Sequence, residues 1–259
     1  VLARSSDAVN GERQLVELRL DRPDASVRLR VIPLRLAGEP AGFVCLCADV
    51  TALRNREREL VTKDATIREI HHRVKNNLQT VAALLRLQSR RMHTEEAKLA
   101  LKNAMARVQS IAVVHELLSQ TYDEQVEFDD VADRILDMVG DVASTTGEVQ
   151  ARREGSFGLV PARVATSLSL IITELCQNAI EHGLSSSSGS VVVRPWVDDE
   201  MMTVAVIDDG KGLPDGFELL NTNSLGLSIV STLVADLDGR FDVFDNPQGH
   251  GTTARIVLP

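Results

Sequence analysis

The hydrophobic positions of the chain change their period twice along the sequence. From Leu15 to Val50 apolar and polar residues roughly alternate, which predicts strands over 15–20, 27–36 and 42–50. No helical pattern separates these segments, so we expect a small antiparallel sheet. Helical spacing then dominates up to Gln120, and after Tyr122 helical and strand patterns mix.

One helix is predicted without interruption from Leu53 to about Gln88. It contains a column of apolar residues at every seventh position, which is typical of a coiled-coil seam. The members of this column are Leu53, Leu60, Ile67, Val74 and Val81. His71 falls near the edge of the apolar stripe, whereas His72 points almost the opposite way, in line with Asn76 and Gln79. We therefore expect His71 to lean toward a core and His72 to face solvent or a partner.

A second helix is predicted over 95–120, with apolar positions that include Leu99, Met105, Val108 and Ile111. Two antiparallel helices bury too little surface alone, and the seven-residue column requires a partner. A homodimeric four-helix bundle meets both needs.

The last part of the chain, starting near Glu127, alternates helices and strands and predicts an α/β sandwich. Helices are expected over 129–142, 161–182 and 225–237, and a loop over 185–189. Strands are expected over 149–153, 191–193, 202–207, 240–244 and 253–258.

Composition narrows the class of protein. A net charge of -9 argues against a nucleic-acid-binding protein, because phosphate contacts need clustered Lys and Arg. Cys45, Cys47 and Cys176 lack metal-ligand spacing and are interpreted as buried thiols of a reducing compartment. No apolar run is long enough for a membrane span, and a cytoplasmic location is expected. The sequence begins at Val1 inside a strand pattern, so we expect a fragment of a longer chain.

Four short motifs of the last domain carry its chemistry. Glu174, Asn178 and His182 lie one helical turn apart, and oxygen ligands of this kind suit Mg²⁺. Asp208 ends a strand and is followed by Gly210 and Gly212, so its carboxylate can accept a hydrogen bond from an adenine amino group. Two further glycine motifs follow. The first, at 224–230, opens a helix, and the second, at 249–252, precedes the last strand.

In this order the motifs resemble the N, G1, G2 and G3 boxes of the GHKL (Bergerat) ATP-binding fold of sensor histidine kinases. His72, with Arg73, Lys75, Asn76 and Asn77, resembles the H-box of the HisKA_2 group, a relative of the HWE kinases. The segment that ends at Asp49-Val50-Thr51 resembles the end of a PAS sensor domain. The match is closest to soluble actinobacterial PAS-containing kinases whose response regulators carry an ANTAR domain.

The resemblance implies an α+β multidomain chain. Its parts would be the C-terminal part of a PAS-like sheet over 1–52, a signalling helix with a dimerisation and phosphotransfer hairpin over 53–122, and a GHKL domain over 123–259. It also implies that ATP and Mg²⁺ are bound, and that a histidine is phosphorylated and then donates the phosphoryl group to a response-regulator aspartate.

Carried over to this sequence, the family's roles fall on named residues. Asn178 would hold Mg²⁺, Glu174 would position the metal or its water, and Asp208 would contact adenine. The remaining nucleotide-binding residues would be His182, Gly210, Gly212, Gly226, Leu227, Gly251 and Thr252. We interpret His72 as the phosphoacceptor and keep His71 as the alternative. Arg73 and Lys75 would attract phosphate, Asn76 would orient the ring, and Glu69 is a candidate base.

Three features depart from the family pattern. Ser224 stands where the G2 box usually begins with Gly, Trp196 is not followed by the Trp-x-Glu pattern of HWE kinases, and the lid between Gly212 and Ser224 is short. Two other functions stay open: an ATP-binding scaffold that transfers no phosphoryl group, and an anti-sigma-factor serine kinase of the same nucleotide fold. The histidine-bearing helix argues against the serine kinase.

Overall fold

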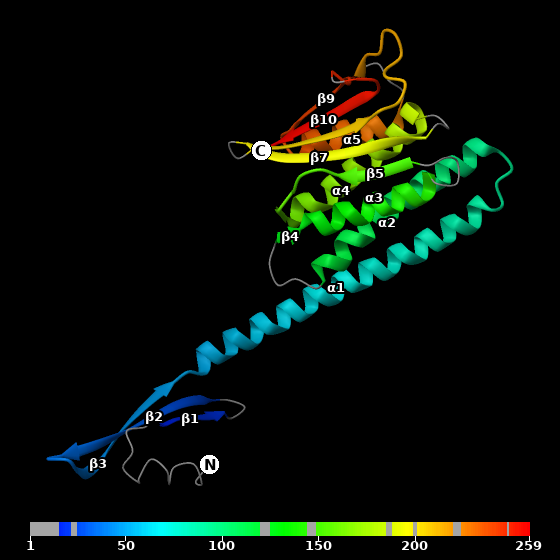
Figure 1. Ribbon diagram of the computed structural model, residues 1–259. Helices are drawn as coiled ribbons and strands as arrows, with labels where there is room; N and C mark the ends of the chain where they lie inside the picture. The colour runs from blue at the N-terminus through cyan, green and yellow to red at the C-terminus, as the bar shows by residue number, and fades with distance from the viewer. Residues whose placement is uncertain are drawn as a thin grey trace. The chain divides into compact units, whose positions relative to one another are not determined.

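The computed structural model describes residues 16–21, 25–119, 125–143, 149–184, 188–198, 201–219, 224–247 and 249–259 (Figure 1). Predictions for Leu15, Tyr122 and the serines at 185–187 lie outside these residues. The chain forms two compact units, Val1–Thr66 and Ile67–Pro259, which are described separately.

The first unit contains an antiparallel sheet of three strands in the order β1-β2-β3, as the alternation predicts. The strands are β1 (Val16–Asp21), β2 (Ser26–Leu36) and β3 (Glu39–Asp49). Cys45 and Cys47 on β3 are exposed, so the expectation of buried thiols is wrong for these two and holds for Cys176. An antiparallel sheet can leave a face open to solvent, and the alternation alone does not tell whether a face is covered.

The sheet leads directly into helix α1 (Thr51–Ser89), which runs for 39 residues and confirms the prediction of one continuous helix. Thr51 joins the two elements: its Oγ1 accepts a hydrogen bond from the Ser26 backbone N–H at 2.9 Å, and its own N–H donates to Asp49 Oδ1 at 2.9 Å. These bonds satisfy groups that a helix start would otherwise leave unpaired. Helix α2 (Glu95–Leu118) follows, with the Thr94 hydroxyl accepting from Ala97 N–H as its N-cap.

The second unit is built around a sheet of five strands in the order β5-β7-β8-β10-β9. These are β5 (Val149–Arg153), β7 (Gly189–Asp198), β8 (Met201–Asp208), β10 (Thr252–Leu258) and β9 (Arg240–Asp245); β5 pairs parallel with β7 and the other pairs are antiparallel. Helices α3 (Phe128–Ala143), α4 (Ala162–Asn178) and α5 (Leu225–Asp236) share one buried core with the sheet, which makes the predicted α/β sandwich (Figure 1).

A short sheet of β4 (Gln125–Glu127) and β6 (Leu159–Pro161) was not predicted from the sequence. Each strand has only three residues, too few for a period-two pattern to emerge. Val126 and Val160, one from each strand, are 1% exposed and belong to the core.

Helix α2 belongs to the same core as the five-stranded sheet and helices α3 and α4. Its buried residues Ala106, Ser110 and Val114 recur every four positions and face α4 and α3. Two of the three are small, which allows the backbones of α2 and α4 to approach closely. The buried face of α2 is therefore covered by α3 and α4 and not by α1.

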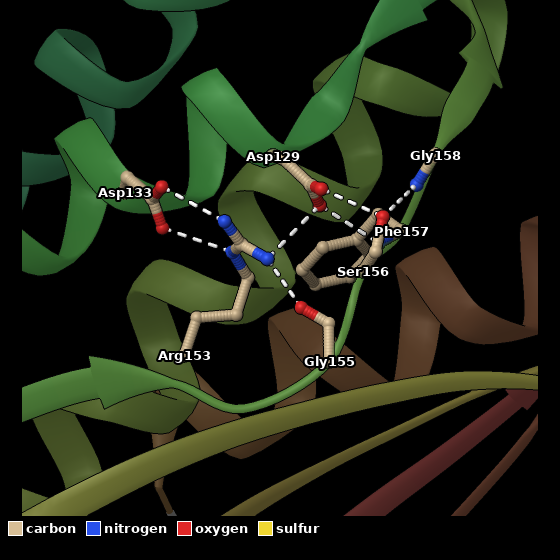
Figure 2. Close-up of polar contacts among 7 residues, drawn as sticks. All are labelled: Asp129, Asp133, Arg153, Gly155, Ser156, Phe157 and Gly158. Carbon is tan, nitrogen blue, oxygen red and sulfur yellow. Dashed lines mark hydrogen bonds and ion pairs between the residues drawn. The ribbon is translucent and has the colours of Figure 1, made fainter.

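The loop between β5 and β6 is tied to the start of α3 by Arg153 (Figure 2). The Arg153 guanidinium binds the Asp133 carboxylate through two hydrogen bonds of 2.9 Å and contacts Asp129 and the Gly155 carbonyl. Asp129 in turn accepts from the Phe157 N–H at 2.7 Å. This bond places the Phe157 ring edge-on against Phe128, with centroids 4.9 Å apart, and closes that end of the core.

Among the described residues, no helix has both the length and the apolar character that crossing a bilayer requires.

Candidate active site

A cavity of about 620 Å³ lies between α4, the end of β8, the segment after it, and the start of α5. This size suits a ligand as large as a nucleotide. It is lined by most of the nucleotide-binding residues expected from the sequence: Asn178, His182, Asp208, Gly212, Leu227 and Thr252. Four expected residues do not line it. Gly210 and Gly251 pack against Asp208 behind the cavity wall, and Gly226 and Glu174 line a smaller cavity.

Asp208 is the most deeply placed charged group of this cavity, at 4% exposure. Its Oδ1 accepts hydrogen bonds from the Gly210 N–H at 2.9 Å and the Thr252 N–H at 3.2 Å. Burial raises the pKa of the Asp208 carboxyl, and the two backbone donors oppose that rise. Both backbone bonds end on the same oxygen, so the carboxylate keeps acceptor capacity for a donor on a ligand.

Three glycines make room for Asp208. A Cβ on Gly183 would lie 2.7 Å from Asp208 Oδ1, and a Cβ on Gly251 would lie 1.9 Å from the Asp208 carbonyl oxygen. Gly251 also has a φ of +101°, which side chains rarely adopt. A Cβ on Gly210 would lie 2.3 Å from the Gly183 carbonyl oxygen. Gly210 and Gly251 therefore act by permitting close backbone packing around the carboxylate.

The helix that carries Asn178 does not continue as a regular helix to His182. It ends at Asn178, and Ala179–Leu184 form a π-helical turn, η2, which the sequence pattern did not reveal. The Gly183 carbonyl in this turn accepts a hydrogen bond from the Lys211 N–H at 3.2 Å. The turn thus joins the end of α4 to the glycine-rich segment after β8, and π-turns of this kind are frequent at functional sites.

Asn178 faces both the 620 Å³ cavity and a smaller one of about 280 Å³. Among the described residues, its buried side-chain Nδ2 has no hydrogen-bond partner. A buried amide without a partner costs free energy unless a ligand or water satisfies it. Asn178 therefore has the environment of a ligand-binding residue.

Glu174 does not line the 620 Å³ cavity, but it lines the smaller one together with Asn178. It is buried and forms a bidentate ion pair with Arg107 of α2, with distances of 2.5 and 2.8 Å. Its Oε2 also lies 2.8 Å from where a Cβ on Gly226 would be, so Gly226 is needed for this packing. The sequence contains no sign of the pair, because Arg107 and Glu174 are 67 residues apart.

The start of α5 explains one departure from the family pattern. Ser224, which replaces the usual glycine, is the N-cap of α5, and its Oγ accepts from the Leu227 N–H at 3.4 Å. Ser224 and Leu227 both line the larger cavity. The substitution of serine therefore keeps the helix N-terminus directed at the cavity.

The two adjacent histidines lie on different sides of α1, as the helical pattern predicts. His71 is half-buried, with its Nδ1 2.9 Å from the Nδ1 of His115 on α2, so that one ring donates and the other accepts. Burial, followed by the charge of a neighbouring histidine, lowers the pKa of both His71 and His115. His72 is exposed.

The basic residues after His72 are both paired. Arg73 binds Glu69 on the same exposed helix face at 2.6 Å, and Lys75 binds Glu116 of α2 at 2.6 Å. Asn76 is exposed next to them. Glu116 and His115 are residues that sequence reasoning missed, since α2 shows only an apolar pattern and no motif.

The cavity fits Mg²⁺ and ATP by the chemistry of its lining. Among the described residues, no three or more His, Cys, Asp or Glu side chains are grouped to hold a metal by themselves. Mg²⁺ in nucleotide sites is held by one or two protein groups together with substrate phosphates, which is what a single Asn178 allows. Lys211 at the cavity wall adds a positive charge suited to phosphate.

Two family models match the chain. Residues 69–143 match HisKA_2, described as a histidine kinase domain, and residues 163–259 match HATPase_c, the histidine kinase-, DNA gyrase B- and HSP90-like ATPase. Through these two domains the chain belongs to the histidine kinases.

Among named proteins the chain is similar to the sensor histidine kinase PdtaS. It is 49% identical to that of Mycobacterium tuberculosis (strain ATCC 25618 / H37Rv) over 98% of this chain and 51% of the relative. It is 48% identical to that of Mycolicibacterium smegmatis over 94% of this chain and 49% of the relative. The chain thus spans about half the length of these curated relatives.

A solved structure agrees with the fold. The Erythrobacter litoralis EL346 blue-light activated histidine kinase superposes with a TM-score of 0.57 at 25% identity, covering 100% of this chain and 79% of that one. Its histidine kinase domain gives a TM-score of 0.56 at 26% identity, covering 79% of this chain and 94% of that one.

Proposed function

We propose that this chain is the kinase portion of a two-component sensor histidine kinase, which phosphorylates His72 from Mg-ATP and then transfers the phosphoryl group to an aspartate of a response regulator. The observation that carries the proposal is the presence, on one chain, of an exposed histidine in a HisKA_2 segment and a nucleotide-sized cavity with Asp208 and Asn178. His71 is the less suitable acceptor, because its Nδ1 is engaged by His115.

When bound, Mg-ATP supplies the phosphoryl group, and transfer depends mainly on positioning and charge neutralisation. Asp208 would accept a hydrogen bond from the adenine amino group, and the Asn178 amide would bind the metal side of the nucleotide. Gly212, Leu227 and Thr252 would line the phosphate and lid side. Attack requires a nitrogen lone pair, and the exposed His72 ring is accessible to present one.

Arg73 and Lys75 would still attract phosphate, but each would first have to leave the carboxylate that it binds, Glu69 or Glu116. Glu174, bound to Arg107, would act on the metal only after that pair separates. Asn76 remains suited to orienting the His72 ring, because both are exposed one turn apart.

The partner proposals are a homodimer and a receiver domain. Helix α1 exposes apolar side chains that a dimer would cover, among them Ile67, Ile70, Val81, Leu84 and Leu87. The resemblance to PAS-containing kinases, together with similarity to a sensor histidine kinase, supports a cytoplasmic location and an ANTAR-type response regulator. The net charge of -9 argues against direct contact with nucleic acid.

The test is incubation of the protein with radiolabelled ATP and Mg²⁺, for the wild type, His72→Gln and His71→Gln. We expect acid-labile, alkali-stable label that is lost only in His72→Gln, and no label when EDTA replaces Mg²⁺. Loss only in His71→Gln would move the phosphoacceptor by one residue. ATP binding without label in the wild type would favour the scaffold function.

A further inference from the structure

A histidine that attacks a phosphoryl group gains positive charge. The lone pair of one ring nitrogen forms the N–P bond, the P–O bond to the leaving ADP breaks, and ADP leaves with that electron pair. The other ring nitrogen still carries its proton, so the ring is cationic until the proton passes to solvent. A nearby negative charge lowers the barrier to this step, yet the residue that follows His72 is the cation Arg73.

Glu69 is one carboxylate within reach, one turn before His72 on α1. Both hydrogen bonds of Arg73, from Nε and Nη2, end on Glu69 Oε1. The side chains of the pair are 75% and 61% exposed, so solvent screens what charge remains. Glu69 is therefore a weak source of negative charge for His72.

Glu116 on α2 is the less exposed of the two carboxylates, so solvent screens its charge less. Lys75 lies three residues after His72, which makes the two side chains neighbours on the helix surface. The Lys75 Nζ is 2.6 Å from Glu116 Oε1, and this pair is only 22% and 32% exposed. The contact between His71 and His115, the residue before Glu116, holds α1 and α2 in this register at the level of His72.

The Glu116 side chain has a second cationic neighbour, and its backbone is also bonded. Its Oε2 lies 3.4 Å from Arg134 Nη1 of α3, and its backbone carbonyl accepts from Ser119 Oγ at 2.6 Å. The hydrogen bond from Lys75 is the main cause that lowers the pKa of Glu116, and the positive charges of Arg134 and His72 act in the same direction. These neighbouring positive charges therefore favour the anionic form of Glu116.

We propose that Glu116 is a positioning residue for His72, which neutralises Lys75 beside the ring and stabilises the positive charge that the ring gains during phosphoryl transfer. This inference rests on the proposed phosphorylation of His72. It assigns this stabilising role to a residue of α2, because Arg73, which follows His72, is itself positively charged.

Glu116→Gln tests the proposal, because it keeps the shape of the side chain and removes its charge. We expect kcat for autophosphorylation to fall about tenfold, with KM for ATP unchanged within about twofold. In the nucleotide-free protein, we expect the His72 ring signals in NMR spectra to titrate at a lower pH than in the wild type. Glu116→Asp should restore part of both effects.

Arg134→Gln is the matched control, since it removes a cation from the same carboxylate and leaves the carboxylate in place. We expect it to keep kcat within about twofold. Equal losses in Arg134→Gln and Glu116→Gln, or an unchanged His72 titration in Glu116→Gln, would overturn the proposal. If the wild type transfers no phosphoryl group, the proposed function fails, and the titration still reports separately whether Glu116 acts on His72.

Discussion

Two guanidinium nitrogens of Arg107 on α2 donate hydrogen bonds to the carboxylate of Glu174 on α4, whose side chain is only 3% exposed. Because this buried ion pair bridges the histidine-bearing hairpin and the ATP-binding fold, its removal is expected to loosen the contact between them. Arg107→Met would leave Glu174 buried without its partner and lower the free energy of unfolding by about 3 kcal/mol. Urea denaturation measures this value.

The control for that variant is Lys98→Met, which breaks an exposed ion pair with Glu95 on the same helix. Its cost should be below about 1 kcal/mol. A similar loss of stability in both variants would show that the burial of Glu174 does not matter.

Gly251→Ala is expected to disrupt the cavity around Asp208. The new Cβ would lie 1.9 Å from the Asp208 carbonyl oxygen, and the φ of +101° adds strain. We expect a loss of about 3 kcal/mol in unfolding free energy and weaker ATP binding. Gly249→Ala is the control, because a Cβ there meets no described atom within 4 Å; thermal denaturation of the two variants should differ clearly, and equal midpoints would contradict the packing argument.

Asp208→Asn is expected to weaken nucleotide binding by about tenfold or more, because a charged acceptor for the adenine amino group is lost. The adjacent Asp209→Asn serves as control. Asp209 accepts from the N–H and hydroxyl of Ser190, both at 2.8 Å, and is no cavity-lining residue. Titration with a fluorescent ATP analogue should leave the Asp209 variant within about threefold of the wild type. Equal losses would remove Asp208 from its assigned role.

Acidification is expected to destabilise the contact between α1 and α2. Burial lowers the pKa of His71 and His115 below the ordinary value of 6.5, so the unfolded chain binds more protons than the folded one in that range. Stability should therefore be full above about pH 6.5 and decline as the pH falls through and below it. Thermal denaturation at pH 7.5 and pH 5.5 measures the decline.

Thermal denaturation of two variants at the same two pH values tests whether the His71–His115 pair causes the decline. His115→Gln should show a smaller decline than the wild type, whereas His93→Gln, at an exposed site, should show the full one. A full decline in His115→Gln would mean that other groups cause the pH dependence.

Local pattern was enough to predict the elements that are long or regularly spaced. The continuous helix α1, the different exposure of His71 and His72, strand β5 and the α/β sandwich all follow from residues close together in sequence. The motif around Asp208 and Asn178 likewise predicted a shared cavity, which the structure contains. The phosphoacceptor and ligand roles of these residues stay predictions.

What the sequence did not reveal depends on contacts between distant segments. Arg107 and Glu116 sit on a helix whose pattern shows only apolar spacing, and their partners Glu174 and Lys75 lie 67 and 41 residues away. The burial of Ala106 and Ser110 by the ATP-binding fold has the same origin, since small residues pack equally well in a bundle or against another domain. The hydrogen bond between the Gly183 carbonyl of the π-turn and the Lys211 N–H also joins segments that are distant in sequence.

The hydrogen bond from the Lys211 N–H to the Gly183 carbonyl also makes it possible to follow the opening of the cavity wall. The Lys211 amide is hydrogen-bonded only as long as the π-turn and the segment after β8 remain joined. Its rate of exchange with deuterated solvent therefore follows the opening of one wall of the cavity, separately from the melting of the sheet. A single backbone position thus shows how often the wall of the cavity opens in solution, before any nucleotide is added.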